Sequence, residues 1–279
     1  MKIRYLGTAA AEGTPAPFCE CDVCEYARAN GGKNIRTRTQ ALIDDSVLID
    51  LCPDTFWHSV RDGLKLCYLD ACLVTHSHSD HLSPKELFWC VPSVAQMKTR
   101  KPFAIYGSEE VVSYIRAEKY DVDVEGLEKD GGITLGALPL FTPSDVCGYR
   151  VTPLAADHPT KSPVLYIIEK DGKSILYATD TGYLPEKTWE YLASIDTVFD
   201  VVSYDATYLI READNRYHMN LDGNTRMRER LIAMGRANEK TRHVLQHFSH
   251  KGLLAHDALV PVAEERGFIA AFDGMEIVL

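Results

Sequence analysis

Long apolar runs are missing from this sequence. No part of its 279 residues approaches 18 consecutive apolar positions, so neither a membrane-spanning helix nor a membrane partner is predicted. The opening residues, MKIRYLGTAA, contain no apolar segment of signal-peptide length. We therefore expect a cytoplasmic protein.

A framework of paired cysteines is missing as well. A chain of this size buries enough apolar surface to need no disulfide bonds. Five of the eight cysteines follow no spacing pattern, and without a secretory signal we expect them to be buried thiols in a reducing compartment. These five are Cys52, Cys67, Cys72, Cys90 and Cys147.

Positive charge is scarce. Lysine and arginine number 30 against 40 aspartate and glutamate residues, which gives a net charge of −10. Proteins that grip nucleic acid usually carry a basic face, so the sequence favours a small substrate over a nucleic-acid partner. A small anionic substrate remains compatible with this balance, because bound divalent cations make a site locally positive.

The order of elements predicts the fold class. Hydrophobic residues make up 46% of the chain and charged residues 25%, as in ordinary globular domains. Hairpins are expected at 41–50, turning at Asp44–Asp45, and at 164–180, turning at Asp171–Gly172. Strands and helices alternate after the first hairpin. This order predicts one α/β domain over residues 1–279, with two mixed β-sheets and helices outside them.

The remaining elements are predicted from apolar periodicity and capping residues. Ser83 and Ser108 are expected to cap helices, and Pro84 suits the first turn of the helix that follows Ser83. The expected helices are 83–97, 108–119, 187–195, 223–238 and 255–267. The expected strands outside the hairpins are 1–8, 67–75, 102–107, 133–141, 149–156, 243–248 and 269–279.

One short stretch carries most of the chemical signal. Residues 75–82, THSHSDHL, place three histidines and an aspartate within six positions, directly after an expected strand. Residues two apart in an extended segment point the same way, so His76 and His78 can face one metal ion. Asp80 and His81 lie where the chain turns and can face a second ion. The alternative is a loop that is rich in histidine and serine by chance, which this specific pattern disfavours.

Three further polar side chains stand where apolar strands end. They are His158 in AADHP, Asp180 in ILYATD and His247 in HVLQH. Each alone would fit a loop histidine or a turn aspartate. Their order after the histidine-rich loop instead favours metal ligands at the carboxyl ends of strands, where open α/β sheets place their sites.

The segments IRYLGT, THSHSDH, ADH, ATDTG and QHFSH resemble the metallo-β-lactamase fold superfamily over nearly the whole chain. The resemblance implies a four-layer αββα sandwich with a dinuclear metal site between the sheets. One departure is Pro84, where many members have glycine. The implied ligands are His76, His78 and His158 for one metal and Asp80, His81 and His247 for the other, with Asp180 bridging both.

A second set of ligand types lies near the N-terminus. Cys19, Cys21 and Cys24 stand in a loop predicted at 18–25, and His250 follows His247 by three residues. Three thiolates and one imidazole form a closed tetrahedral site, which is typical of structural zinc. Free thiols or a disulfide are the alternatives, and the tight spacing favours metal.

The cysteine triplet, FDGMEI at 272–277 and GYLPEKT at 182–188 resemble one subgroup of the superfamily. This subgroup is the phosphodiesterase of the carbon–phosphorus lyase pathway, which opens phosphoribosyl 1,2-cyclic phosphate. The resemblance implies a small phosphodiester substrate and suggests a homodimer. The resemblance is specific for the subgroup and less specific for the substrate.

A mechanism follows from these assignments. Two divalent ions, zinc or manganese with iron as a further option, would lower the pKa of a shared water, so that a bridging hydroxide attacks phosphorus at neutral pH. The departing alkoxide needs a proton. The resemblance places a histidine near His218, which we therefore expect to be the general acid, with a surface histidine as the alternative. Asp80 is also expected to orient the water.

Groups that bind the substrate phosphate are harder to identify. Arg36, Arg38 and Lys161 are the basic residues expected near the cleft, against the alternative of solvated surface. Asp205 ends another strand and is expected to hold a ligand histidine from behind. No role is predicted for His58, His243 and His256, which follow no pattern.

Three other functions compete with phosphodiester hydrolysis. The same metals could hydrolyse a lactone, lactam or thioester, although a proton donor such as His218 matters more for an alkoxide than for a thiolate. A tRNA 3′-processing endonuclease would carry a basic arm, and the sequence contains no such insertion. A non-catalytic metal-binding protein would not need seven ligands.

Overall fold

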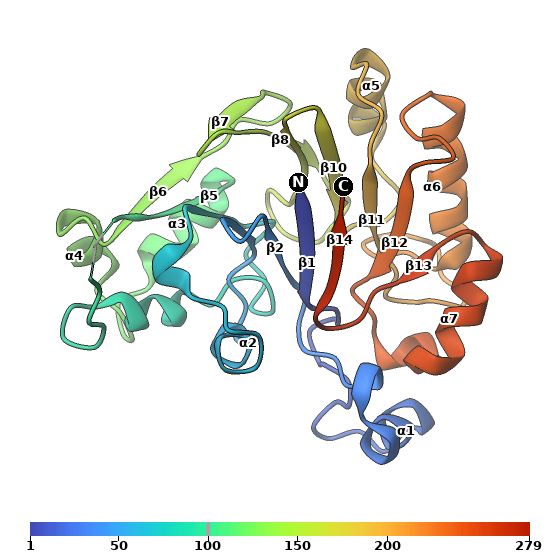
Figure 1. Ribbon diagram of the computed structural model, residues 1–279, viewed down its shortest axis with the longest axis horizontal. Helices are drawn as coiled ribbons and strands as arrows, with labels where there is room; N and C mark the ends of the chain where they lie inside the picture. Colours follow the sequence, from blue (N-terminus) through green and yellow to red (C-terminus); the bar gives the residue numbers. More distant parts are fainter. Residues whose placement is uncertain (99–100) are drawn as a thin grey trace.

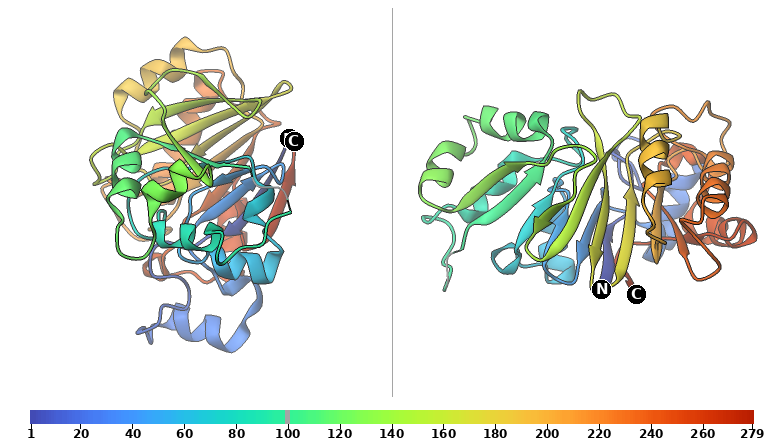
Figure 2. Two further views of the ribbon diagram at one scale, coloured as in Figure 1. Left: turned by 90° about the vertical axis from the view of Figure 1, so that its left-hand side faces the viewer. Right: turned by 90° about the horizontal axis from the view of Figure 1, so that it is seen from above.

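The computed structural model describes residues 1–98 and 101–279. Two seven-stranded sheets stack on each other, and helices cover their outer faces, as the views of Figures 1 and 2 show. Each sheet is antiparallel in one half and parallel in the other. The predicted αββα sandwich of two mixed sheets is confirmed.

The first sheet is formed mainly by the N-terminal half of the chain. Its order is β14-β1-β2-β3-β4-β5-β6, and β3 to β6 run parallel. The final strand of the chain therefore pairs with the first. The strands are β1 (Lys2–Gly7), β2 (Gln40–Ile43), β3 (Val47–Ile49), β4 (Ala71–Leu73), β5 (Phe103–Gly107), β6 (Ile133–Ala137) and β14 (Met275–Val278).

The second sheet is formed by the C-terminal half, in the order β13-β12-β11-β10-β9-β8-β7. Strands β10 to β13 run parallel, so their carboxyl ends lie along one edge. The strands are β7 (Ser144–Val146), β8 (Tyr149–Ala155), β9 (Val164–Lys170), β10 (Lys173–Ala178), β11 (Val201–Asp205), β12 (Arg242–Gln246) and β13 (Ile269–Ala270).

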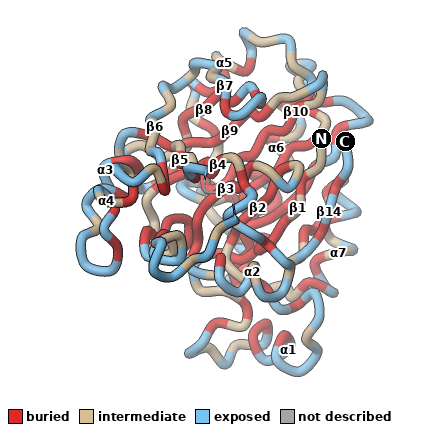
Figure 3. Tube along the Cα trace, turned by 60° about the vertical axis from the view of Figure 1, so that its left-hand side comes forward, coloured by how far each residue is buried: buried red, intermediate tan, exposed pale blue. Residues whose placement is uncertain are grey.

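Strand alternation explains how both faces of the first sheet are covered. In β2, Ala41 and Ile43 pack into the core between the sheets, whereas Leu42 points to the outer helices. Strand β4 repeats this pattern, with Leu73 inside and Cys72 outside. Successive side chains of a strand point to opposite faces, so a sheet covered on both sides needs apolar residues throughout. Figure 3 shows the resulting buried strands.

Helices form the two outer layers. Those that pack on the first sheet are α2 (Thr55–Asp62), α3 (Glu109–Ala117) and α4 (Val124–Lys129), and those on the second are α5 (Glu186–Ser194), α6 (Leu221–Ala233) and α7 (His256–Glu265). Helix α1 (Asp22–Asn30) projects beyond the edge of the sandwich (Figure 1). Four 3₁₀ turns complete the set: η1 (Gly32–Asn34), η2 (Leu66–Tyr68), η3 (Pro84–Cys90) and η4 (His250–Gly252). None of the helices within the described ranges is long and apolar enough to cross a membrane.

The local predictions for the regular elements largely hold. The turns at Asp44–Asp45 and Asp171–Gly172 have positive φ at both residues. The second is a two-residue hairpin loop, which requires this, whereas the first loop spans residues 44–46. Ser108 caps α3 by accepting a hydrogen bond from Val111 N. Helices α1, α2 and α4 and strand β7 were not predicted.

Three predictions are wrong. The helix expected at 83–97 is the 3₁₀ turn η3, Ser83 makes no capping hydrogen bond, and the residue before Pro92 leaves the helical region. The strand expected at 67–75 is limited to β4, because its partner β3 spans only three residues. Cys67 and Cys147 are exposed and Cys90 is half-buried, whereas Cys52 and Cys72 are buried as expected.

Candidate active site and metal centres

The carboxyl ends of strands from both sheets meet at one place. The histidine-rich loop follows β4 of the first sheet, and His158 follows β8 of the second. Asp180 and His247 follow β10 and β12, which lie in the parallel half of the second sheet. The topology therefore brings together side chains that are up to 171 positions apart in the sequence, from His76 to His247.

The first cluster contains His76, His78 and His158. Nε2 of His158 lies 2.9 Å from Nδ1 of His78. One ring nitrogen from each of the three histidines lies within 4.8 Å of the other two. Bonds of about 2.0–2.1 Å from zinc to imidazole nitrogen would let one ion contact all three.

The second cluster contains Asp80, His81, Asp180 and His247. Oδ2 of Asp180 lies 3.1 Å from Nε2 of both His81 and His247. The same oxygen lies 4.0 Å from Nε2 of His76 and 3.9 Å from Nε2 of His158, in the first cluster. Asp180 thus stands between the two clusters, where a shared ligand would stand.

Two observations show that this donor set fits metal ions. Nε2 of His76 and Oδ1 of Asp180 are buried and have no hydrogen-bond partner, although buried polar atoms are nearly always paired. Burial lowers the pKa of His81, but the carboxylates of Asp180, Asp80 and Asp50 outweigh this effect and raise it well above the usual value. The same negative field favours a bound cation.

Four of the five ligand-type histidines in the two clusters are held from behind by a hydrogen bond. Nδ1 of His81 lies 2.7 Å from Oδ2 of Asp50, and Nδ1 of His76 lies 3.0 Å from Oγ1 of Thr75. Nδ1 of His158 bonds to the carbonyl of Tyr217, and Nδ1 of His247 to Oγ1 of Thr207. Such partners fix the ring orientation and the tautomer of metal ligands.

Asp50 and Thr207 were missed by the sequence reasoning. Asp50 follows β3, so the signal used for His158, a polar residue where an apolar strand ends, was present there too. Asp50 and His247 have φ angles of 67° and 59°. Backbone strain of this kind persists where the surrounding structure holds it, and it concentrates at functional sites.

His218 lies beside the second cluster, where a proton donor is expected. Its Nδ1 is 2.8 Å from Oδ2 of Asp205, and its ring stacks on that of His247 at a centroid distance of 5.4 Å. Burial lowers the pKa of His218, but Asp205 more than compensates, so the net pKa is raised. The expectation that Asp205 holds a ligand histidine is wrong, because Asp205 bonds to His218 and lies 3.7 Å from Nδ1 of His247.

The clusters open into a cavity of about 240 Å³. The sequence did not predict several of its wall residues, among them the polar side chains of Glu12, Tyr208 and Lys251. The lining residues are Ala10, Ala11, Glu12, His78, Asp80, His158, Pro159, Asp180, Thr207, Tyr208, His218, His247, Ser249 and Lys251.

The basic residues predicted for phosphate binding do not line this cavity. Arg36 is buried behind the site and donates to Thr8 Oγ1, the Ala271 carbonyl and His256 Nδ1. Arg38 pairs with Asp54, and Lys161 is exposed. Side-chain direction depends on tertiary contacts that sequence spacing does not contain.

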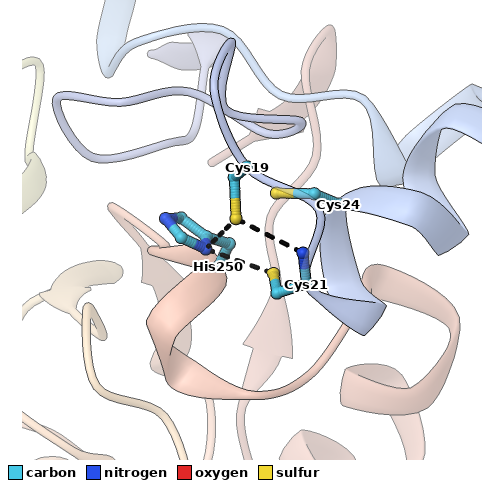
Figure 4. A group of neighbouring side chains, drawn as sticks. All are labelled: Cys19, Cys21, Cys24 and His250. Carbon is cyan, nitrogen blue, oxygen red and sulfur yellow. Dashed lines mark hydrogen bonds between the residues drawn. The ribbon is translucent and has the colours of Figure 1, made fainter.

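The cysteine triplet and His250 form a separate group, shown in Figure 4. Nδ1 of His250 lies 3.4 Å from Cys19 Sγ and 3.3 Å from Cys21 Sγ. The segment predicted as a loop at 18–25 ends at Cys21, the residue before α1, and Cys24 lies inside that helix. All four donor atoms lie within 4.8 Å of one another, which fits one tetrahedral zinc.

The thiols of this group differ in acidity. The Cys21 amide donates to Cys19 Sγ, and this hydrogen bond lowers the pKa of Cys19. Burial raises the pKa of Cys24 to about 12. A bound cation would be needed to deprotonate Cys24 at neutral pH, as coordinating ions do.

Comparison with known proteins gives the family. The model of a family described as the beta-lactamase superfamily domain matches residues 46–248. The chain belongs to the beta-lactamase superfamily. The resemblance seen in the sequence is confirmed, and the fold is that of the metal-dependent hydrolases of this superfamily.

Several relatives and solved structures match the whole chain. Coenzyme PQQ synthesis protein B of Methylobacterium radiotolerans is 23% identical, with 100% of both chains covered. The zinc-bound structure of PqqB from Methylobacterium extorquens matches with a TM-score of 0.76 and 19% identity over 100% of each chain. A new diphosphatase from the PhnP family matches with a TM-score of 0.73 and 20% identity, over 100% of this chain and 97% of that one. At these identities the structural matches establish the fold.

Proposed function

We propose that this protein is a phosphodiesterase that opens cyclic or small phosphodiesters, with phosphoribosyl 1,2-cyclic phosphate or a similar ester as substrate. Its residues would hold two divalent cations, zinc or manganese, and a third, structural zinc. The observation that carries the proposal is His218 on the cavity wall, beside the second cluster, with its Nδ1 bonded to the buried carboxylate of Asp205.

The two clusters divide the ligands between the cations. His76, His78 and His158 would hold one, and Asp80, His81 and His247 the other, with Asp180 shared. When bound, such a pair supplies hydroxide at neutral pH and neutralises charge on a phosphoryl group. Asp80 lines the cavity, so its free oxygen can also orient the attacking water.

His218 would protonate the leaving alkoxide. Asp205 occupies its Nδ1, which leaves Nε2 for a group in the cavity. The raised pKa of His218 keeps a larger share of the ring protonated at neutral pH. General acids of this kind contribute about 10²- to 10⁴-fold, and they matter most when the leaving group is a poor one. An alkoxide is such a group, whereas a thiolate departs without a proton.

The likeness to the PhnP-family diphosphatase supports hydrolysis at phosphorus, because that protein has the same fold over the whole chain. The Cys19–Cys21–Cys24–His250 group supports the phosphodiesterase subgroup that the sequence resembles.

The test is a substrate panel with metal-loaded protein. Phosphoribosyl 1,2-cyclic phosphate, 2′,3′-cyclic nucleotides and bis(p-nitrophenyl) phosphate should be hydrolysed. A lactone, a lactam, a thioester and a precursor tRNA should not. The Asp180→Asn variant, prepared identically, shows how much activity comes from contaminants. Hydrolysis of the carbonyl substrates alone, or of the precursor tRNA alone, would overturn the proposal.

A further inference from the structure

One basic side chain on the cavity wall has no part in the proposed chemistry. Lys251 is the only lysine or arginine among the lining residues, all of which lie in the described part of the chain. It belongs to the 3₁₀ turn η4, between the ligand-type residue His247 and helix α7. The other charged wall residues are carboxylates and histidines.

The turn that carries Lys251 is fixed from two sides. His250, directly before it, contacts Cys19 Sγ and Cys21 Sγ through Nδ1. Ser249 Oγ accepts a hydrogen bond from the backbone N–H of Lys251 at 3.1 Å. The Cys–His group therefore shares a turn with the cavity wall, and Figure 4 shows His250 pointing at the cysteines.

Glu12 secures the same turn from the cavity side. Its Oε1 accepts a hydrogen bond from Ser249 Oγ and lies 3.4 Å from Nε2 of His250. The carboxylate is thus occupied by the turn. No carboxylate oxygen of residues 1–98 or 101–279 lies within 4.0 Å of Lys251 Nζ. Lys251 is exposed and lines the cavity, so its flexible side chain can reach a ligand there.

We infer that Lys251 binds a second anionic group of the substrate, distinct from the phosphodiester that is hydrolysed. The two clusters already provide the groups that face the reacting phosphate. The ammonium group of Lys251 would therefore bind an oxyanion farther along the substrate. The lysine ammonium is a compact charge on a flexible stem, which suits a phosphate or a carboxylate. This inference rests on the proposed function.

The experiment compares three matched substrates: adenosine 2′,3′-cyclic phosphate, its 5′-phosphate and its 5′-carboxylate analogue. Lys251→Ala should raise KM for the 5′-phosphate by about 10- to 100-fold, the range for a lost hydrogen bond to a charged group. KM for the unmodified nucleotide should rise far less. The carboxylate analogue shows whether charge or phosphate geometry is recognised. Lys251→Arg should recover part of the loss.

Lys161→Ala is the matched control, because Lys161 lies three residues after His158 but does not line the cavity. It should leave every KM unchanged. An equal rise in KM for all three substrates with Lys251→Ala, or no rise at all, would overturn the inference.

Calorimetry separates this inference from the proposed function. Metal-loaded wild-type protein should bind adenosine 3′,5′-bisphosphate more tightly than adenosine 3′-phosphate, and Lys251→Ala should remove the difference. If no phosphodiester is hydrolysed but this difference exists, the proposed function fails and the anion site stands. If phosphodiesters are hydrolysed and the difference is absent, the anion site fails and the function stands.

Discussion

The carboxylate of Asp205 lies 2.8 Å from Nδ1 of His218 and 3.7 Å from Nδ1 of His247. The buried aspartate therefore fixes the histidine at the cavity wall, while the ligand-type histidine takes its bond from Thr207. An aspartate that orients a histidine usually selects one tautomer and stabilises the charged ring. This geometry makes the proton-donor role of His218 testable apart from metal binding.

Replacing His218 with glutamine should separate leaving groups. Hydrolysis of a 2′,3′-cyclic nucleotide, which releases an alkoxide, should fall by about 10²- to 10⁴-fold because the proton donor is lost. Hydrolysis of bis(p-nitrophenyl) phosphate should fall much less, because p-nitrophenolate leaves unprotonated. Metal content per chain, measured by mass spectrometry, should stay at the wild-type value. Equal losses on both substrates together with lost metal would make His218 a ligand instead.

Asp180→Asn should remove at least one of the two active-site cations. Its Oδ2 lies within 4.0 Å of histidines in both clusters, so the amide would weaken both sites. Turnover should fall below detection, and metal analysis should show the missing ion. Asp196→Asn, at an exposed aspartate in the described structure, is the control. Wild-type metal content in Asp180→Asn would refute the ligand assignment.

Asp50→Asn tests the support of His81. Asparagine tolerates the positive φ of this position, so the backbone should be preserved. Loss of the carboxylate that holds His81 Nδ1 should weaken metal affinity by about 10- to 100-fold. Competition with a coloured chelator measures the affinity. An unchanged affinity would show that His81 needs no such support.

Cys21→Ser should cost about one zinc per chain, because the closed site needs all four ligands. The free energy of unfolding should fall, since zinc bound only by the folded state stabilises it. Cys147→Ser changes an exposed cysteine far from this group and provides the control for both measurements. If zinc content and stability match the wild type, the Cys–His group does not bind zinc.

The contact between Arg36 and His256 predicts acid sensitivity. The Arg36 guanidinium can only donate, so His256 Nδ1 must accept and the ring stays neutral. Burial, together with Arg36, lowers the pKa of His256 to about 4. The folded pKa lies below the unfolded value of about 6.5, so the stabilisation is complete above pH 6.5 and is lost as the pH falls through 4.

Urea unfolding at pH 7.5 and 4.5, with protein from which a chelator has removed the metal, measures this effect without a contribution from metal release. The free energy of unfolding should decrease by about 2 kcal/mol more in the wild type than in His256→Gln, in which no ring is protonated. Identical pH dependence in the two proteins would show that His256 does not titrate on unfolding.

The sequence predicted the site well where residues of metal-ligand type stand at the ends of strands. His76, His78, His158, Asp180 and His247 could be recognised because each is a polar residue within a few positions of the end of an apolar strand. Such positions converge when parallel strands share an edge. The positions of these residues in the sequence therefore predict that they lie close together in the fold.

Other parts of the site could not be read this way. The bond between Asp205 and His218 depends on a loop that returns across the cavity, and Arg36 turns toward His256 behind the site. Thr207 holds His247 from 40 positions away. Spacing along the chain does not determine where such side chains point. Helix α1 was missed because the cysteine triplet that runs into it indicated a loop.

The position of Asp180 between the clusters has a mechanical consequence. The histidine-rich loop belongs to the first sheet, and His158, Asp180 and His247 belong to the second. Ions held by both sets would link the two sheets. They would join residues that are far apart in the sequence, as the closure of a long loop does. Separating the layers would then require releasing the ions, so the melting temperature should rise with free metal concentration. The stability of the sandwich would then depend on how far the site is loaded.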